Sequence, residues 1–189
     1  FVVSLLGKEV DSFSAKGLLN GEYIDVSEEN LKGSWSIVFF YPADFTYVCP
    51  TELGDLADNY EEFKSMDVEI FAVSTDTHHT HHAWHTSSET IAKINFPMVA
   101  DPTGAICRNF DVYIEEDGLA DRGTFVIDPD GKIVAYEIHP DEIGRNVSEL
   151  MRKVKAAQYT REHPNEVCPA AWEEGQATLE PSIDLTGKI

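Results

Sequence analysis

Residues 37–52 of the chain read Ile37-Val38-Phe39-Phe40-Tyr41-Pro42-Ala43-Asp44-Phe45-Thr46-Tyr47-Val48-Cys49-Pro50-Thr51-Glu52. The first five residues form an uninterrupted apolar run, which predicts a buried strand. Beyond Cys49, apolar side chains recur at the 3.6-residue spacing of a helix, at Leu53, Leu56, Ala57, Tyr60 and Phe63. The segment therefore predicts a strand, a short loop and a helix whose first turn carries Cys49.

This position favours a reactive cysteine. The first turn of a helix has backbone N–H groups without partners and the positive end of the helix dipole. Both stabilise the thiolate, which is the nucleophilic form of cysteine. Pro42, Thr46 and Cys49 also stand in a Pro-x-x-x-Thr-x-x-Cys pattern. Pro42 can shield the site and stiffen the turn, and the Thr46 hydroxyl can reach a substrate oxygen or the sulfur. The alternative is a buried structural cysteine near a helix start.

Length and charge limit the classes of partner. The 189 residues suffice for one domain with a substantial core. Fourteen Lys and Arg against 34 Asp and Glu give a net charge of -20, which argues against nucleic acid or an anionic membrane surface as a partner. The sequence has no run of 18 apolar residues, and residues 1–7 lack the pattern of a signal peptide. We therefore expect neither a nucleic-acid nor a membrane partner.

The three cysteines are Cys49, Cys107 and Cys168. An odd count without a secretory signal fits a reducing compartment, here the cytoplasm, and catalytic rather than structural sulfur. No C-x-x-C pair is present, which disfavours a disulfide oxidoreductase, and the spacings do not build a zinc site. Cys107 lies at an apolar position of a short predicted helix, so we expect it to be buried and inert. We expect no metal and no cofactor, since a glycine-rich dinucleotide loop is also missing.

Strand and helix patterns alternate along the chain. The turn Asn20-Gly21 predicts an N-terminal hairpin of residues 15–19 and 23–26. Further strands are predicted at 36–41, 68–74, 96–100, 123–128 and 132–138, and further helices at about 79–93, 103–110 and 144–159. This order predicts an α/β protein with a central mixed sheet flanked by helices, a pattern compatible with a thioredoxin-like fold.

The last 30 residues differ in character. Prolines interrupt them, and no long periodic pattern remains. We therefore expect a domain of residues 1–160 and an extended C-terminal arm of residues 161–189, which packs on a neighbour or stays mobile. Cys168 lies in this arm and would be free to reach another sulfur. An incidental thiol is the alternative.

Six segments resemble the typical 2-Cys peroxiredoxins. They are residues 45–52, 72–78, 83–93, 118–125, 166–169 and 181–189. The match is to a bacterial branch that serves as the peroxidase component of NADH-dependent alkyl hydroperoxide reductase systems. The resemblance implies a thioredoxin-like fold and a thiol-dependent peroxidase that reduces hydrogen peroxide and organic hydroperoxides.

The resemblance also implies roles for the sulfur atoms. Cys49 corresponds to the peroxidatic cysteine, which becomes a sulfenic acid, and Cys168 to the resolving cysteine, which forms an intersubunit disulfide with Cys49. Thr46 and the backbone N–H of Cys49 would donate to the oxygens on which charge develops.

Two arginines and a glutamate match further positions of the family. Arg122 corresponds to the active-site arginine, which would favour the thiolate and contact the peroxide. Glu52 and Arg145 resemble residues that orient the loop and Arg122. The alternatives are an exposed arginine at a strand end and solvated surface charges.

The family also implies partners. A flavoprotein disulfide reductase or a thioredoxin-like protein would supply electrons. The chain would form a homodimer that assembles into a decamer, with Thr80 at the contact between dimers. The alternative function is a chaperone-like holdase or a redox-signalling scaffold built on the same ring.

A histidine-rich stretch leaves one alternative open. His78, His81, His82 and His85 follow the spacing of one helical face, and histidine is a common metal ligand. No carboxylate lies at matching spacing, so metal binding is the less favoured interpretation. We expect Trp84 to pack near the active site.

Overall fold

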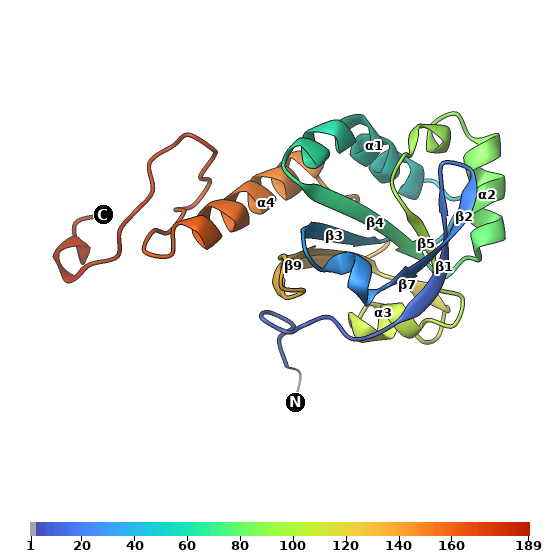
Figure 1. Cartoon of the computed structure of the whole chain (residues 1–189), viewed down its shortest axis with the longest axis horizontal. Helices are drawn as coiled ribbons and strands as arrows, with labels where there is room; N and C mark the ends of the chain where they lie inside the picture. The colour runs from blue at the N-terminus through green and yellow to red at the C-terminus, as the bar shows by residue number, and fades with distance from the viewer. Residues whose placement is uncertain (1–2) are drawn as a thin grey trace. The chain divides into compact units, whose positions relative to one another are not determined.

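The computed structural model describes residues 3–189 (Figure 1). Its contacts divide the chain into two compact units, one ending at Val147 and the other spanning Ser148–Ile189. Each unit is described by itself. The division expected from the sequence, into a domain of residues 1–160 and an arm of residues 161–189, stays a prediction.

The first unit contains a seven-stranded mixed sheet. Its strands are β1 (Ser14–Leu19), β2 (Glu22–Ser27), β3 (Trp35–Phe40), β4 (Val68–Ser74), β5 (Met98–Ala100), β8 (Arg122–Ile127) and β9 (Ile133–His139). They lie in the order β2-β1-β5-β4-β3-β8-β9. β3, β4 and β5 run parallel, whereas the β1–β2 and β8–β9 hairpins pair antiparallel to them and within themselves. The predicted mixed sheet and N-terminal hairpin are confirmed.

Three helices and two short turns belong to this unit. They are α1 (Cys49–Ser65), α2 (His78–Ser87), α3 (Ala105–Asn109) and the 3₁₀ turns η1 (Glu28–Leu31) and η2 (Ile91–Lys93). A small second sheet pairs β6 (Tyr113–Ile114) with β7 (Leu119–Ala120), and the sequence pattern did not reveal it. Within residues 3–189, no helix combines the length and the apolar character needed to cross a membrane.

The central strands are buried on both faces. Every residue of β3 is buried, as parallel strands covered by helices require. Val38 and Phe40 belong to the core cluster that also holds residues of α3. Strand residues alternate between faces, so Ile37 and Phe39 point to the opposite face, where α1 packs (Figure 1). The two layers of helix fix the carboxyl end of β3, from which the loop to Cys49 departs.

Three predicted elements are shorter than expected, and one of them is the helix predicted at 103–110, which spans only Ala105–Asn109. The helix predicted at 79–93 ends at Ser87, because Ser88 adopts an extended backbone, and only the 3₁₀ turn η2 follows. The strand predicted at 96–100 begins at Met98, since Pro97 has no N–H to contribute to the sheet.

The second unit is built on α4 (Val147–Glu162), whose first residue is the last residue of the first unit. Four of the five apolar residues predicted to share a face of this helix are buried, namely Val147, Leu150, Met151 and Val154. After the helix, Val167 and Leu179 exchange two backbone hydrogen bonds of 2.8 and 3.0 Å, and a 3₁₀ turn, η3 (Ile183–Leu185), follows. Trp172 is buried and packs against Tyr159 in a tilted arrangement, with ring centres 5.3 Å apart.

Candidate active site

Cys49 is the first residue of α1 and is buried. β3 ends at Phe40, and the loop of residues 41–48 carries the chain to the helix start. Pro50 occupies the second helical position, where its missing N–H costs nothing because no helical partner exists there. The expectation that the first helical turn presents Cys49 is confirmed.

The loop before Cys49 has a constrained backbone. Phe45 has φ +58, a left-handed conformation that is unusual for a bulky residue. Its ring lies 5.9 Å from the ring of Trp84, which is buried. The backbone N–H of Asp44 donates to Oδ2 of Asp76 at 2.8 Å. These contacts hold the loop on α2 and the end of β4, and Trp84 packs beside the site as predicted.

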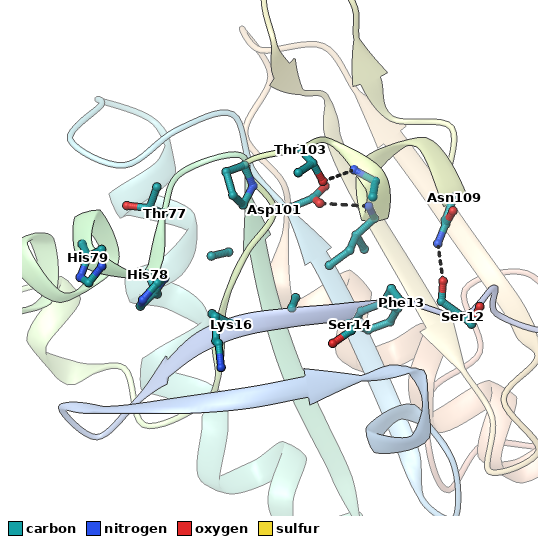
Figure 2. A pocket seen from close by; sticks show the side chains of 15 residues that line it. Ser12, Phe13, Ser14, Lys16, Thr77, His78, His79, Asp101, Thr103 and Asn109 are labelled. Carbon is teal, nitrogen blue, oxygen red and sulfur yellow. Dashed lines mark hydrogen bonds between the residues drawn. The ribbon is translucent and has the colours of Figure 1, made fainter.

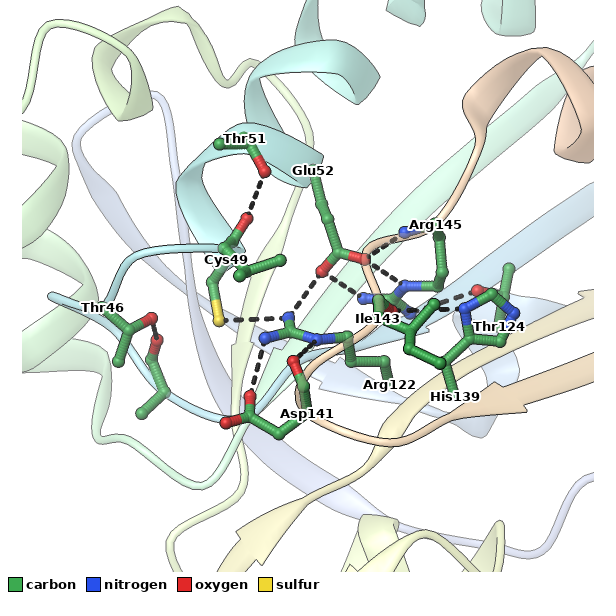
Figure 3. A network of polar contacts seen from close by, with 12 residues as sticks. Thr46, Cys49, Thr51, Glu52, Arg122, Thr124, His139, Asp141, Ile143 and Arg145 are labelled. Carbon is green, nitrogen blue, oxygen red and sulfur yellow. Dashed lines mark hydrogen bonds and ion pairs between the residues drawn. The ribbon is translucent and has the colours of Figure 1, made fainter.

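Arg122 contacts the Cys49 sulfur. Thr124 of β8 pairs with Phe39 of β3, so Arg122, two residues earlier, lies level with the start of the loop to Cys49. Its Nη1 lies 3.4 Å from Sγ of Cys49 (Figure 3). Burial alone would lower the pKa of Arg122, but its bonds and attraction to Cys49 and Glu52 raise it. The guanidinium is therefore a fixed positive charge beside the sulfur.

Glu52 joins the two arginines. It lies one helical turn after Cys49, and its side chain is 2% exposed. Its Oε1 accepts from Nη1 of Arg122 at 2.7 Å and from Nη2 of Arg145 at 2.9 Å. Burial raises the pKa of Glu52, but the bonds and charges of the arginines outweigh burial and hold that pKa below its ordinary value. Glu52 is therefore an anion between two cations.

Arg145 lies in the loop before α4, and its non-helical backbone takes part in the network. Its N–H donates to Oε2 of Glu52 at 2.9 Å, and its Nε donates to the same oxygen at 2.6 Å. Nη1 donates to the carbonyl of Gly123 and the hydroxyl of Thr124, and the guanidinium lies 3.4 Å from the centre of the Phe39 ring. Burial lowers the pKa of Arg145, and Glu52 offsets only part of this effect.

Three other expected residues lie apart from the sulfur contacts. Thr46 donates its hydroxyl to the carbonyl of Ala43 at 2.8 Å and not to the sulfur. Pro42 is buried in the loop. Thr80 lies in the first turn of α2, where its N–H donates to the hydroxyl of the capping residue Thr77 at 3.3 Å.

The other two cysteines differ in exposure. Cys107 is buried, as predicted, and its N–H donates to Oδ2 of Asp101 at 2.8 Å. Burial and the Asp101 carboxylate raise the pKa of its thiol well above the ordinary value, so this sulfur is inert as a thiolate nucleophile. Cys168, in the second unit, is half-buried, and burial raises the pKa of its thiol.

Asp141 contacts Arg122, and no sequence pattern predicts this contact. Its backbone oxygen accepts from Nε of Arg122 at 2.8 Å, and its Oδ1 accepts from Nη2 at 2.7 Å. Asp141 follows β9 in a short loop, without a motif or a characteristic spacing. Only the folded chain brings it to the arginine.

The histidines of α2 divide among different environments. His78, His79 and His82 surround the ring of Tyr23, and His85 faces the carbonyl of Ile94 at 3.0 Å. The part of the chain that the structure describes has no group of three or more His, Cys, Asp or Glu side chains that could hold a metal ion.

His81 is buried and has a carboxylate partner. Its Nδ1 lies 2.6 Å from Oδ2 of Asp44, and its Nε2 lies 3.0 Å from the carbonyl of Val99. The hydroxyl of Tyr41 donates to the other oxygen of Asp44 at 2.6 Å. No carboxylate lies at matching spacing in the sequence, but the fold brings the distant Asp44 to His81 of α2. The pair attaches the Cys49 loop to α2.

The stability that His81 provides should decrease as pH rises. Burial opposes its charge, but Asp44 and the Val99 carbonyl outweigh burial and raise its pKa. Because the pKa of His81 is higher in the folded than in the unfolded protein, its charge stabilises the fold fully below the unfolded pKa of about 6.5. This stabilisation is lost as pH rises through the folded pKa. We expect urea titrations to show a larger loss of unfolding free energy for His81→Gln at pH 6 than at pH 9. An equal loss at both would contradict the charged pair.

A separate cavity of about 360 Å³ lies in the first unit. Residues of β1, the start of α2 and the segment 100–109 line it, including Lys16, His78 and Asp101 (Figure 2). None of the residues that contact Cys49 lines it. The carboxylate of Asp101 is directed to the backbone of α3, where it accepts hydrogen bonds from the N–H groups of Ile106 and Cys107.

Comparison with known proteins gives full-length relatives. The chain is 59% identical over 187 residues to alkyl hydroperoxide reductase C of Escherichia coli (strain K12) and 60% identical over 187 residues to that of Bacillus subtilis (strain 168). Each alignment covers 99% of this chain and 100% of the relative.

Solved structures agree with the fold. The crystal structure of Enterococcus faecalis AhpC superimposes with a TM-score of 0.86 at 45% identity, over 88% of this chain and 100% of that one. A reduced 2-Cys peroxiredoxin of Plasmodium vivax superimposes with a TM-score of 0.91 at 28% identity, over 96% of each chain. The thioredoxin-like peroxiredoxin fold is therefore confirmed.

Two family models match the sequence. Residues 156–188 match the C-terminal domain of 1-Cys peroxiredoxin, a segment that includes Cys168. Residues 6–136 match the AhpC/TSA family, and this region carries Cys49, Glu52 and Arg122. From the site, the fold and these matches together, the chain belongs to the AhpC/TSA family of peroxiredoxins.

Proposed function

We propose that the chain is a thiol-dependent peroxidase that reduces hydrogen peroxide and organic hydroperoxides at Cys49. The thiolate attacks the terminal oxygen of the hydroperoxide, an S–O bond forms and the O–O bond breaks. Hydroxide or alkoxide leaves and takes a proton from solvent. Cys49 is then a sulfenic acid, oxidised by two electrons, and the substrate is reduced to water or an alcohol.

The observation that carries this proposal is the 3.4 Å contact between Arg122 and the Cys49 sulfur. Oxygen transfer places negative charge on the departing oxygen, and a fixed cation beside the reacting atoms stabilises that charge. Glu52 and Arg145 hold the guanidinium in a buried network, so it needs no rearrangement when the charge develops. Pro42 and Thr46 would shape the loop around the substrate.

The second half of the cycle uses Cys168 of the partner subunit. Its thiol attacks the sulfenic sulfur, an S–S bond forms and water leaves. A disulfide reductase, either a flavoprotein or a thioredoxin-like protein, then supplies two electrons and two protons and restores both thiols. The free thiols of this cycle suit a reducing compartment, which we take to be the cytoplasm.

A homodimer follows from this cycle, and an edge strand supports it. β9 is the last strand of the sheet, and its apolar residues Val134 and Ile138 are 37% and 40% exposed. An unpaired strand edge is a template for pairing with another chain. Further association of dimers into a decamer, with Thr80 of α2 at the contact, completes the proposal. Sedimentation velocity of the reduced protein would test both states.

The cycle predicts a covalent dimer whose formation depends on two of the three cysteines. After one equivalent of hydrogen peroxide, a non-reducing gel should show this dimer for wild type and for Cys107→Ser. Cys49→Ser should give none because no sulfenic acid forms. Cys168→Ser should give none because nothing resolves that acid.

Other outcomes would contradict specific parts of the proposal. A dimer that persists in Cys49→Ser would remove the assignment of Cys49 as the attacking sulfur. A dimer that disappears only in Cys107→Ser would assign the resolving role to a buried thiol. Trapping of the sulfenic acid with dimedone in Cys168→Ser, and its absence in Cys49→Ser, would separate oxidation from resolution.

A further inference from the structure

Asp141 is an exposed carboxylate bound to a buried arginine. Its side chain is 69% exposed, whereas the side chain of Arg122 is 2% exposed. The two are joined at 2.7 Å through Oδ1 of Asp141 and Nη2 of Arg122. Figure 3 shows this carboxylate and the Cys49 sulfur bound to the same guanidinium. Asp141 therefore brings a negative charge from the solvent side to the group that contacts the reacting sulfur.

The donors of Arg122 indicate where a substrate can bind. A guanidinium has five N–H groups. Nε donates to the Asp141 carbonyl, Nη1 donates to Cys49 and Glu52, and Nη2 donates once to Asp141. The second N–H of Nη2 has no partner among residues 3–189. An oxygen of the hydroperoxide that accepts this N–H would lie beside the Asp141 carboxylate, on the same nitrogen.

The side chain of Asp141 is not needed to hold the arginine. The backbone carbonyl of residue 141 accepts from Nε at 2.8 Å whichever side chain stands there. Glu52 holds Nη1 on the other side at 2.7 Å. The carboxylate therefore adds a negative charge to a guanidinium that other atoms already orient.

The charges around the sulfur show the effect of that carboxylate. With Cys49 as the thiolate, three anions and two cations form the network, namely Cys49, Glu52 and Asp141 against Arg122 and Arg145. The formal charge is negative with Asp141 and zero without its charge. Glu52 is buried between both arginines, so Asp141 is the exposed anion that an arriving substrate meets.

We propose that Asp141 is a specificity-determining residue that disfavours hydroperoxides carrying a negative charge and leaves neutral hydroperoxides as the preferred substrate class. The inference rests on the proposed peroxidase function and deepens it. A neutral hydroperoxide approaches the free N–H of Arg122 without repulsion from the Asp141 carboxylate. A substrate with a carboxylate near its peroxide group meets this carboxylate at close range, where solvent and salt only partly screen the two charges.

A matched pair of substrates tests this inference. The two are 4-hydroperoxy-4-methylpentanoic acid, anionic at pH 7.5, and its neutral methyl ester. The rate constant for oxidation of Cys49 by each is measured in single-turnover stopped-flow experiments at low salt. Asp141→Asn keeps an oxygen that accepts from Nη2 and removes the charge. We expect Asp141→Asn to raise the ratio of the acid rate constant to the ester rate constant by about three- to tenfold.

Glu142→Gln is the control for overall charge. Glu142 is the neighbouring exposed carboxylate, and the hydrogen bonds of Arg122 go to Cys49, Glu52 and Asp141 instead. The Glu142→Gln variant should change the ratio of acid to ester rates much less than Asp141→Asn does. The salt dependence is a second readout, on which a purely structural role of Asp141 would have no effect. Added NaCl should raise the ratio of acid to ester rates in wild type, because salt screens the repulsion between the two carboxylates. The rise should be much smaller in Asp141→Asn, where this repulsion is already absent.

Two results would overturn the inference. A ratio of acid to ester rates that is the same in wild type and Asp141→Asn would show that the charge does not select substrates. A parallel fall of both rates in Asp141→Asn would assign Asp141 to holding Arg122 alone. Failure of the peroxidase function gives a different result, since wild type would then oxidise Cys49 with neither substrate. That outcome removes the proposed function and this inference together.

Discussion

Replacing Arg122 with glutamine should lower the second-order rate constant of Cys49 for hydrogen peroxide by about 100- to 1,000-fold, the loss found when one fixed donor to a developing oxyanion is removed. The guanidinium Nη1 lies 3.4 Å from the sulfur, so it is placed to stabilise the charge on the leaving oxygen during the reaction. Stopped-flow tryptophan fluorescence of the reduced protein, calibrated by quench-flow trapping of the sulfenic acid, measures the constant directly.

Two companion variants make this experiment specific. Arg122→Lys keeps a positive charge but loses the planar fork that binds Cys49, Glu52 and Asp141 together, so its rate constant should lie between those of wild type and Arg122→Gln. Arg108→Gln removes an exposed arginine that pairs with Glu115, away from the sulfur contacts, and should leave the constant unchanged. A wild-type constant in Arg122→Gln would contradict the role of the guanidinium.

Local patterns were sufficient for much of the fold. The apolar run before Tyr41 and the helical spacing after Cys49 identified β3 and α1, and Asn20-Gly21 identified the first hairpin. These signals are local: a strand buried on both faces appears as a continuous apolar run, and a helix buried on one face appears as a 3.6-residue apolar period. The order of the strands was not available from such traces. The pairing of β3 with β8, which presents Arg122, joins segments more than eighty residues apart.

The site residues that stand in a recognisable motif could be predicted from the sequence, and the others could not. Cys49, Glu52 and Arg122 stand in segments that resemble the peroxiredoxins, and the structure brings the three side chains together. Asp44 and Asp141 carry no such signal. The first meets His81 and the second meets Arg122 only after the chain has folded, since a carboxylate in a loop has no characteristic spacing.

Burying the charges of Glu52, Arg122 and Arg145 costs free energy unless each charge keeps its partner. Glu52 is the anion that compensates Arg122 and Arg145, and all three side chains are 2% exposed. Removing the carboxylate takes away the carboxylate partner of buried Arg145 and leaves buried Arg122 with only the exposed Asp141 and the Cys49 sulfur. Breaking a buried pair in this way is far more destabilising than replacing the whole pair with apolar side chains. Glu52 should therefore matter for folding as well as for rate.

Glu52→Gln should lower the free energy of unfolding by about 3–5 kcal/mol, the usual effect of leaving a buried charge without its partner. Urea titrations of the fully reduced protein, followed by circular dichroism at pH 7.5, measure this loss. Glu61→Gln is the matched control on the same helix, because its side chain is 84% exposed and its ion pair with Lys64 is 3.5 Å long. It should change the free energy by less than about 0.5 kcal/mol.

A double variant separates lost compensation from a general loss of packing. In Glu52→Gln with Arg145→Met, the buried cation that lost its carboxylate partner is gone, and the methionine can pack on the Phe39 ring that the Arg145 guanidinium covers at 3.4 Å. The double variant should therefore be more stable than Glu52→Gln alone, because the apolar side chain removes a buried charge that has lost its partner. If instead the two losses add, the electrostatic account of the network is wrong, and Glu52 stabilises the fold by packing. The rate constant for hydrogen peroxide should stay low in both variants, since Arg122 has lost the carboxylate that orients its Nη1 toward Cys49.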